Sequence, residues 1–119
     1  MQYPLPEILD RLSIVILKIE RLKDNRIIKE YNDLVNALKE FKCPYEDKWF
    51  RELKDINGQI WDLEADIRNF LEDKLGLEEV GKRALAIRDK NKIRISIKNR
   101  IQQETNEGYL EVKGNHRSE

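Results

Sequence analysis

The chain has 119 residues, of which 39% are charged, and its formal net charge at pH 7 is zero. A chain of this length is expected to form one domain, over residues 1–119, with one hydrophobic core. The balanced charge argues against nucleic acid as a partner, because phosphate-binding surfaces need a clear positive excess. No apolar run approaches the ~20 residues that span a bilayer, so we expect no membrane insertion.

The cysteine content and the start of the sequence predict a compartment. Cys43 is the only cysteine, so the chain cannot form an internal disulfide. Residues 1–6 lack the charged and apolar blocks of a secretory signal peptide. Both features favour a cytoplasmic protein.

The longest periodic stretch predicts a helix over residues 45–74. Its apolar side chains are spaced alternately four and three residues apart, which places them on one side of an α-helix. They are Trp49, Leu53, Ile56, Ile60, Leu63, Ile67 and Phe70. Asn57-Gly58 is a turn signal, but the apolar spacing continues through it in phase. We therefore expect one continuous helix, with Gly58 on the side away from the apolar face.

The first helix, predicted over residues 6–24, has two apolar sides. The main side consists of Leu5, Ile8, Leu12, Val15, Ile19 and Leu22. Ile14 and Leu17 lie on nearly the opposite side, so the helix needs neighbours on both sides. Either it is the central helix of a bundle, or Ile14 and Leu17 contact a second copy of the chain in a homodimer.

Helices are also predicted over residues 26–42 and 77–105, and the second of these is ambiguous in its C-terminal half. Residues 92–98 alternate between polar and apolar, a pattern that on its own is typical of a strand. In the helical interpretation, Ile93, Ile97 and Ile101 share one face at four-residue spacing. We favour the helix, because no turn signal interrupts the segment.

Four helices with short connections predict an all-α fold. The expected architecture is an antiparallel four-helix bundle built from long helices. Residues 106–119 then form a short extended C-terminal tail.

A polar face is predicted inside this bundle. The helical line through Ile87 continues into polar residues that would point inward, and further polar residues flank the apolar face of the third helix. The candidates for a ligand-binding site on these two helices are Glu64, Arg68, Arg88, Asn91, Arg94 and Lys98.

Three interpretations of these residues stay open. In the first they form a structural salt-bridge network, with Glu64 paired to Arg88, Arg94 or Lys98, because an uncompensated buried charge costs about several kcal/mol. In the second they form a basic pocket for a small anion, such as a phosphorylated sugar or a nucleotide. In the third they are simply exposed to solvent.

The sequence indicates no catalytic centre. Asp62 and Asp66 are one turn apart, a spacing that can hold a divalent metal. With Glu7 and Asp10 they resemble the carboxylate helices of all-α nucleotide pyrophosphohydrolases, but no Glu-x-x-Glu pair lies near them in the sequence. That spacing occurs at Glu104 and Glu107, towards the other end of the chain. The only histidine, His116, has no second ligand near it in the sequence. No cofactor is therefore predicted, and a solvated helix face is the simpler interpretation of the two aspartates.

Three segments, in order along the chain, carry a further resemblance. They are Glu7-Ile8-Leu9-Asp10-Arg11-Leu12-Ser13-Ile14 with Lys18-Ile19-Glu20-Arg21, then Ile60-Trp61-Asp62-Leu63-Glu64 with Ile67-Arg68, then Asn91, Arg94, Lys98 and Ile101. Together they resemble an uncharacterised family of small bacterial helical proteins, known as a domain of unknown function. Ile16 and Glu111-Val112-Lys113 depart from its pattern. The resemblance implies a mainly helical protein without an assigned activity. Its members are often encoded near glycan and lipopolysaccharide biosynthesis genes, which implies an accessory role.

The favoured function is a non-enzymatic, self-associating accessory or adaptor protein. It would form a homodimer through Ile14 and Leu17, with another protein as a further candidate partner. The alternatives are a small-anion-binding protein that uses the basic face between the third and fourth helices, and a metal-dependent all-α phosphohydrolase.

Overall fold

The computed structural model describes residues 3–41, 47–69 and 76–108, and the side chains of the last range as far as residue 105. These residues form α1 (Leu5–Leu22), the short 3-10 helix η1 (Asn25–Ile27), α2 (Ile28–Lys39), α3 (Asp47–Arg68) and α5 (Leu77–Gly108). No strand occurs within these ranges. The predicted all-α helical bundle is therefore confirmed, and residues 92–98 are helical. The predicted tail lies almost entirely outside the described residues.

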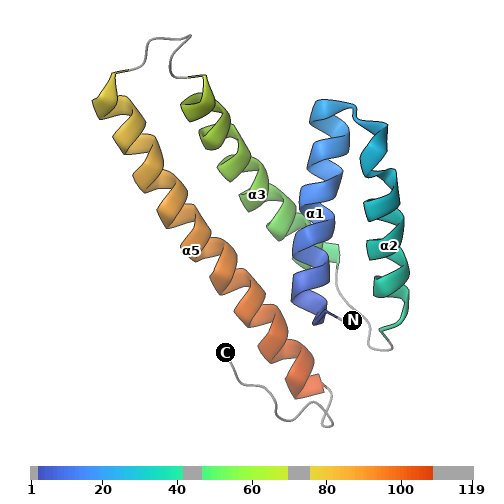
Figure 1. The fold of residues 1–119 in the computed structure, drawn as a ribbon. Helices are drawn as coiled ribbons and strands as arrows, with labels where there is room; N and C mark the ends of the chain where they lie inside the picture. The colour runs from blue at the N-terminus through green and yellow to red at the C-terminus, as the bar shows by residue number, and fades with distance from the viewer. Residues whose placement is uncertain (1–2, 42–46, 70–75, 109–119) are drawn as a thin grey trace.

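The helices form two hairpins, α1–α2 and α3–α5, and α1 lies where the two hairpins meet (Figure 1). Consecutive helices run in opposite directions, with α2 packed on α1 and with α5 packed along α3 (Figure 1). α1 contacts α2, α3 and α5, so it is the central helix of the bundle. This contact pattern explains why α1 is apolar on two sides.

The ends of α1 follow from local sequence signals. Pro6 lies in the first turn, where a missing N–H removes no helical hydrogen bond, and Glu7 faces the positive end of the helix dipole. Lys23 adopts a left-handed conformation with φ 56°, and its N–H donates to the Ile19 carbonyl at 3.2 Å. The Asp24 side chain then accepts a hydrogen bond from the Arg26 N–H at 2.9 Å and caps η1.

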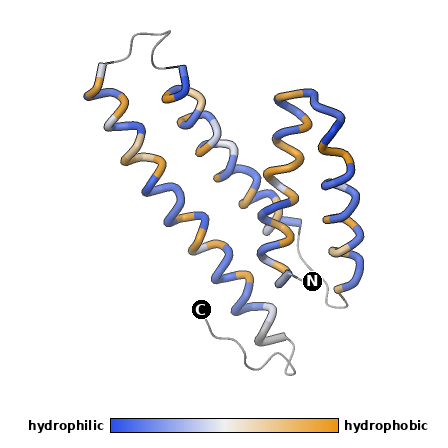
Figure 2. Tube along the Cα trace, in the orientation of Figure 1, coloured by the Kyte–Doolittle hydropathy of each residue, from blue (hydrophilic) through white to orange (hydrophobic). Residues whose placement is uncertain are grey.

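The core has two parts. One joins α1, α3 and α5 and contains Leu5, Leu9, Trp49, Leu53, Ile56, Ile60, Ile97 and Ile101. The other joins α1 and α2 and contains Ile8, Leu12, Val15 and Leu34. Apolar segments recur along every helix, and polar segments interrupt them along the whole of α5 (Figure 2).

The apolar spacing of α3 is confirmed over its N-terminal half and fades towards its C-terminal end. Leu63 and Ile67 are only half-buried, and Phe70 lies outside the described residues. On α5, Ile97 and Ile101 are buried as predicted, but Ile93 is 49% exposed. The fully helical path of α5 turns Ile93 away from α1 and α3.

Two predictions about α1 and α3 were wrong. Gly58 is buried against α1, and a Cβ atom on it would lie 3.4 Å from Arg21 Nη2 and 3.8 Å from Leu17 Cδ2. Leu17 is only 3% exposed. Because α3 covers Leu17 within one chain, this side chain offers no surface to a second copy. Ile14 is half-buried.

None of the helices that the structure describes is both long enough and apolar enough to cross a membrane. The hydrophobic residues of α1, the most apolar helix, are largely used in packing against α2, α3 and α5.

Candidate functional site

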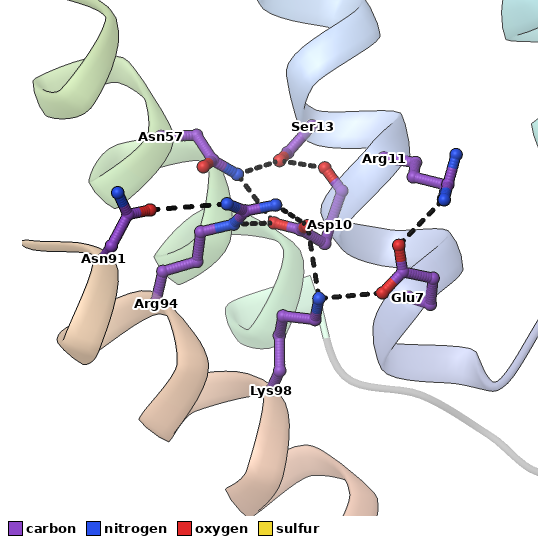
Figure 3. Close-up of polar contacts among 8 residues, drawn as sticks. All are labelled: Glu7, Asp10, Arg11, Ser13, Asn57, Asn91, Arg94 and Lys98. Atoms are coloured by element: carbon purple, nitrogen blue, oxygen red, sulfur yellow. Dashed lines mark hydrogen bonds and ion pairs between the residues drawn. The ribbon is translucent and has the colours of Figure 1, made fainter.

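A fully buried carboxylate, Asp10, lies where α1, α3 and α5 meet (Figure 3). Its Oδ1 accepts hydrogen bonds from Arg94 Nε and from Asn57 Nδ2, both at 2.9 Å. Its Oδ2 accepts a hydrogen bond from Arg94 Nη2 and lies 3.5 Å from Lys98 Nζ. Asp10 therefore connects the three helices through charged and neutral donors.

Further polar side chains extend this arrangement in both directions. Asn57 Nδ2 also donates to Ser13 Oγ at 2.9 Å, and that hydroxyl donates to the Asp10 carbonyl at 2.7 Å. Lys98 Nζ donates to Glu7 Oε1 at 2.7 Å, and Arg94 Nη1 donates to Asn91 Oδ1 at 3.4 Å. Together with Arg11, which binds Glu7, we call these residues the Asp10 cluster. Its members are Glu7, Asp10, Arg11, Ser13, Asn57, Asn91, Arg94 and Lys98.

Helical periodicity positions the cluster. Glu7 and Asp10 are one turn apart on α1, as are Arg94 and Lys98 on α5, so each helix presents two charges to the other. Asn57 precedes the buried Gly58, where α1 and α3 approach closely. The close approach brings the short Asn57 side chain within reach of Asp10 and Ser13.

The electrostatics of the cluster favour the ionised state of Asp10. Burial alone would raise its pKa, but hydrogen bonds from Arg94 and Asn57 and the charges of Arg94 and Lys98 together lower it below the ordinary value of 3.8. The hydrogen bond to Asp10 likewise raises the pKa of Arg94. Both groups are therefore charged near neutral pH, and each compensates the other.

This electrostatic arrangement predicts a loss of stability in acid. Burial alone would raise the pKa of Glu7, but the hydrogen bonds and charges of Lys98 and Arg11 outweigh this effect, so the folded pKa also lies below the ordinary 4.5. Carboxyl groups with lowered pKa values stabilise the fold above their unfolded values and lose that contribution as pH falls through the folded values. We expect the free energy of unfolding, measured with urea, to fall below about pH 4.5.

The matched control for this pH series is Glu7→Gln. The amide cannot titrate, so the variant should show a shallower decline of stability with acid than the natural chain. Equal declines in the two proteins would show that the Glu7 carboxylate contributes nothing to acid stability.

The structure places three of the predicted site residues inside the cluster and three outside it. Asn91, Arg94 and Lys98 point inward as predicted, but the two cations bind Asp10 and Glu7 of α1, and Asn91 accepts a hydrogen bond from Arg94. The predicted partner was Glu64 of α3, which is exposed. Arg68 is also exposed, and Arg88 lies 3.5 Å from its neighbour Asp89.

Sequence reasoning missed the acidic half of the cluster, although a signal existed. Asp10, Ser13 and Leu17 are spaced three and four residues apart along α1, so they lie on one line of the helix. Two polar residues on a line that ends in a buried leucine indicate buried polar groups with partners. Asn57 carried no comparable signal, because Asn57-Gly58 also fits a turn.

The aspartates considered for a metal site are bound to arginines instead. Asp62 pairs with Arg21 of α1, and Asp66 lies 3.1 Å from Arg83 Nε of α5. In the part of the chain that the structure describes, no group of three or more His, Cys, Asp or Glu side chains is placed to hold a metal ion. Cys43 and His116 lie outside the described residues.

Two surface grooves lie beside α1 and α3. The larger, of about 390 Å³, is lined by Leu17, Glu20, Arg21, Arg51, Lys54, Asp55, Gly58, Gln59 and Asp62. The smaller, of about 280 Å³, is lined by Leu9, Leu12, Ile16, Asp47, Phe50 and Arg51. Arg94 and Lys98 line neither of these two grooves, and both form ion pairs with carboxylates of α1.

Comparison with known proteins gives no family for this chain. No protein-family model matches it, and no curated protein and no solved structure matches it. The resemblance to a domain of unknown function therefore stays a prediction.

Proposed function

We propose that the protein is a non-enzymatic accessory protein that self-associates as a homodimer. The observation that carries the proposal is a set of large aliphatic side chains left exposed on α5. They are Leu77, Leu85, Ile93 and Ile95, with exposed fractions of 81%, 53%, 49% and 54%. Scattered exposed aliphatics are ordinary on a protein surface, and these four lie on more than one side of α5. Leu85 lies on the side opposite the ion pairs to α1 and α3, so it is the one that a second chain packed against α5 would bury.

The packing of α5 supports this proposal. Its ion pairs to α1 are made by Arg94 and Lys98, in its C-terminal half, whereas Arg83 in its N-terminal half binds Asp66 of α3. The N-terminal half runs beside α3, with the α1–α2 hairpin on the other side of α3 (Figure 1). Fully burying one exposed Leu or Ile side chain contributes roughly 1.5–3 kcal/mol. A further helix packed against the N-terminal half of α5 would therefore stabilise it.

The Asp10 cluster supports a structural role more than a binding role. Its two carboxylates and three cations are joined by hydrogen bonds, and Asp10 binds Arg94 through both carboxylate oxygens. A bound phosphate or carboxylate would have to displace Asp10 and leave it buried without its cation, which is costly. The small-anion alternative is therefore less favoured.

Analytical ultracentrifugation tests the proposal. Between about 1 and 100 µM, a range set by the weak affinities typical of small interfaces, we expect a reversible monomer–dimer equilibrium. A single monomeric species throughout this range would contradict self-association.

A further inference from the structure

We infer that the second copy binds the outer face of α5 and runs antiparallel to it, with the two-fold axis at Leu85. The outer face consists of Glu78, Gly81, Lys82, Leu85, Asp89 and Lys92. This inference rests on the proposed self-association and goes beyond it, because it assigns the surface and the orientation of the two chains.

The residues of the outer face form one continuous stripe. They are spaced three and four residues apart, so they fall within an arc of about 100° on the helix. All of them are exposed, and Leu85 is the large aliphatic residue at the centre. The α5 residues that contact α1 or α3, among them Arg83, Ile87 and Arg94, lie on the other side of the helix.

Gly81 allows a second helix to approach closely. A Cβ atom built on it would have no atom within 4 Å, so the backbone is open to the outside at this point. Glycine inside a helix is destabilising relative to alanine, because its backbone loses more conformational freedom on folding. A close contact between two helix backbones, one turn from Leu85, would explain why position 81 is a glycine. The single chain has no close contact at this position.

The charges of the outer face match under a two-fold axis. Glu78 and Lys92 lie seven residues before and after Leu85. In an antiparallel pair of α5 helices, Glu78 of each copy therefore lies beside Lys92 of the other. The two-fold axis generates this opposite-charge contact twice. A parallel pair would instead place Glu78 beside Glu78 and Lys92 beside Lys92, which repel.

The inner charges of the stripe agree with this arrangement. Gly81 and Asp89 lie four residues on either side of Leu85, so Asp89 approaches the open backbone at Gly81 and its neighbour Lys82. Arg88 would face Lys82 of the other copy, but its guanidinium lies 3.5 Å from Asp89 of its own chain. Asp89 is thus placed between the two cations.

Both members of the outer charge pair are available for a contact. The Glu78 side chain is 84% exposed and lies 3.8 Å from Lys82 Nζ. Lys92 is exposed, and it has no ion pair or hydrogen bond within the described residues. A second copy therefore gains these contacts without breaking a buried interaction.

A charge-swap series measured by ultracentrifugation tests the orientation. Glu78→Lys and Lys92→Glu should each weaken the dimer about tenfold, or about 1.4 kcal/mol, because each turns two weakly attractive contacts between exposed charges into two weakly repulsive ones. The double variant Glu78→Lys with Lys92→Glu should restore the natural affinity. Weak dimers from both single variants without rescue in the double variant would overturn the antiparallel arrangement.

Leu85→Glu tests the surface itself. Two carboxylates would meet at the two-fold axis, so the dissociation constant should rise at least about a hundredfold, beyond the effect of either charge swap. The matched control is Leu22→Glu, because Leu22 is 58% exposed at the end of α1, away from the outer face. At a concentration low enough that all the proteins are monomeric, circular dichroism should give equal melting temperatures for the natural chain and these variants.

The outcomes separate this inference from the proposed function. If the natural chain is monomeric, both fail. If the natural chain dimerises and Leu85→Glu dimerises equally well, self-association stands and the outer face of α5 is not its interface.

Discussion

The Asp10→Ala variant is expected to lose about 3–5 kcal/mol of unfolding free energy, the range for removing one partner of a buried ion pair. The substitution leaves the Arg94 guanidinium without the carboxylate that accepts two of its hydrogen bonds. Asn57 and Lys98 also lose a partner. Urea or guanidinium denaturation followed by circular dichroism measures the change.

Asp62→Ala is the matched control for Asp10→Ala. The Asp62 side chain also pairs with an arginine, Arg21, but it is 68% exposed. Exposed ion pairs contribute about 0–1 kcal/mol, so this variant should unfold nearly as the natural chain does. An Asp10→Ala variant that loses no more stability than Asp62→Ala would show that the cluster does not hold α5 to the bundle.

The second large effect is expected from Ile101→Ala, which should lower the unfolding free energy by about 2–5 kcal/mol. Ile101 of α5 is fully buried against core residues of α1 and α3. Replacing it with alanine therefore leaves a cavity. Ile95→Ala is the control on the same helix, because Ile95 is 54% exposed. Its unfolding free energy should stay within about 0.5 kcal/mol of the natural value.

This pair of variants also tests the rotation of α5. The alternating sequence of residues 92–98 does not by itself say which isoleucines face the core. If Ile95→Ala proved the more destabilising variant, α5 would be rotated about its axis relative to α1 and α3.

The helices were predictable because the spacing of apolar residues depends only on the sequence of each helix itself. The four-and-three spacing from Trp49 to Ile60 predicted the buried side of α3, which the structure confirms, whereas the predicted range of 45–74 was longer than the observed helix, which ends at Arg68. On α5 the pattern was weaker because charged residues pair across helices on its inward side. Arg94 and Lys98 were nevertheless predicted to point inward, since they continue the line of Ile87.

The partners of these cations were not predictable from periodicity. Spacing says which way a side chain points from its own helix, but not which other helix it meets. Glu64 was the predicted partner because it flanks the apolar face of α3. The acid that reaches Arg94 is Asp10, which the fold brings from the first helix.

The position of Leu17 was missed for a related reason. A second apolar side on α1 fitted a central helix and a dimer contact equally well. Only the close approach of α3 at Gly58 distinguishes the two, and that approach depends on how α1 and α3 cross.

The ion pair between Asp10 and Arg94 joins residues 84 positions apart, so it closes nearly the whole chain. Contacts between residues this distant are expected to form late in folding, because the intervening chain must first be ordered. The α1–α2 and α3–α5 hairpins, which are local, can form before it. The cluster is then absent from the transition state, so Asp10→Ala should speed unfolding and leave the refolding rate in stopped-flow nearly unchanged. The buried charges would thus govern how long the native state persists, while the apolar faces of the hairpins set how fast it forms.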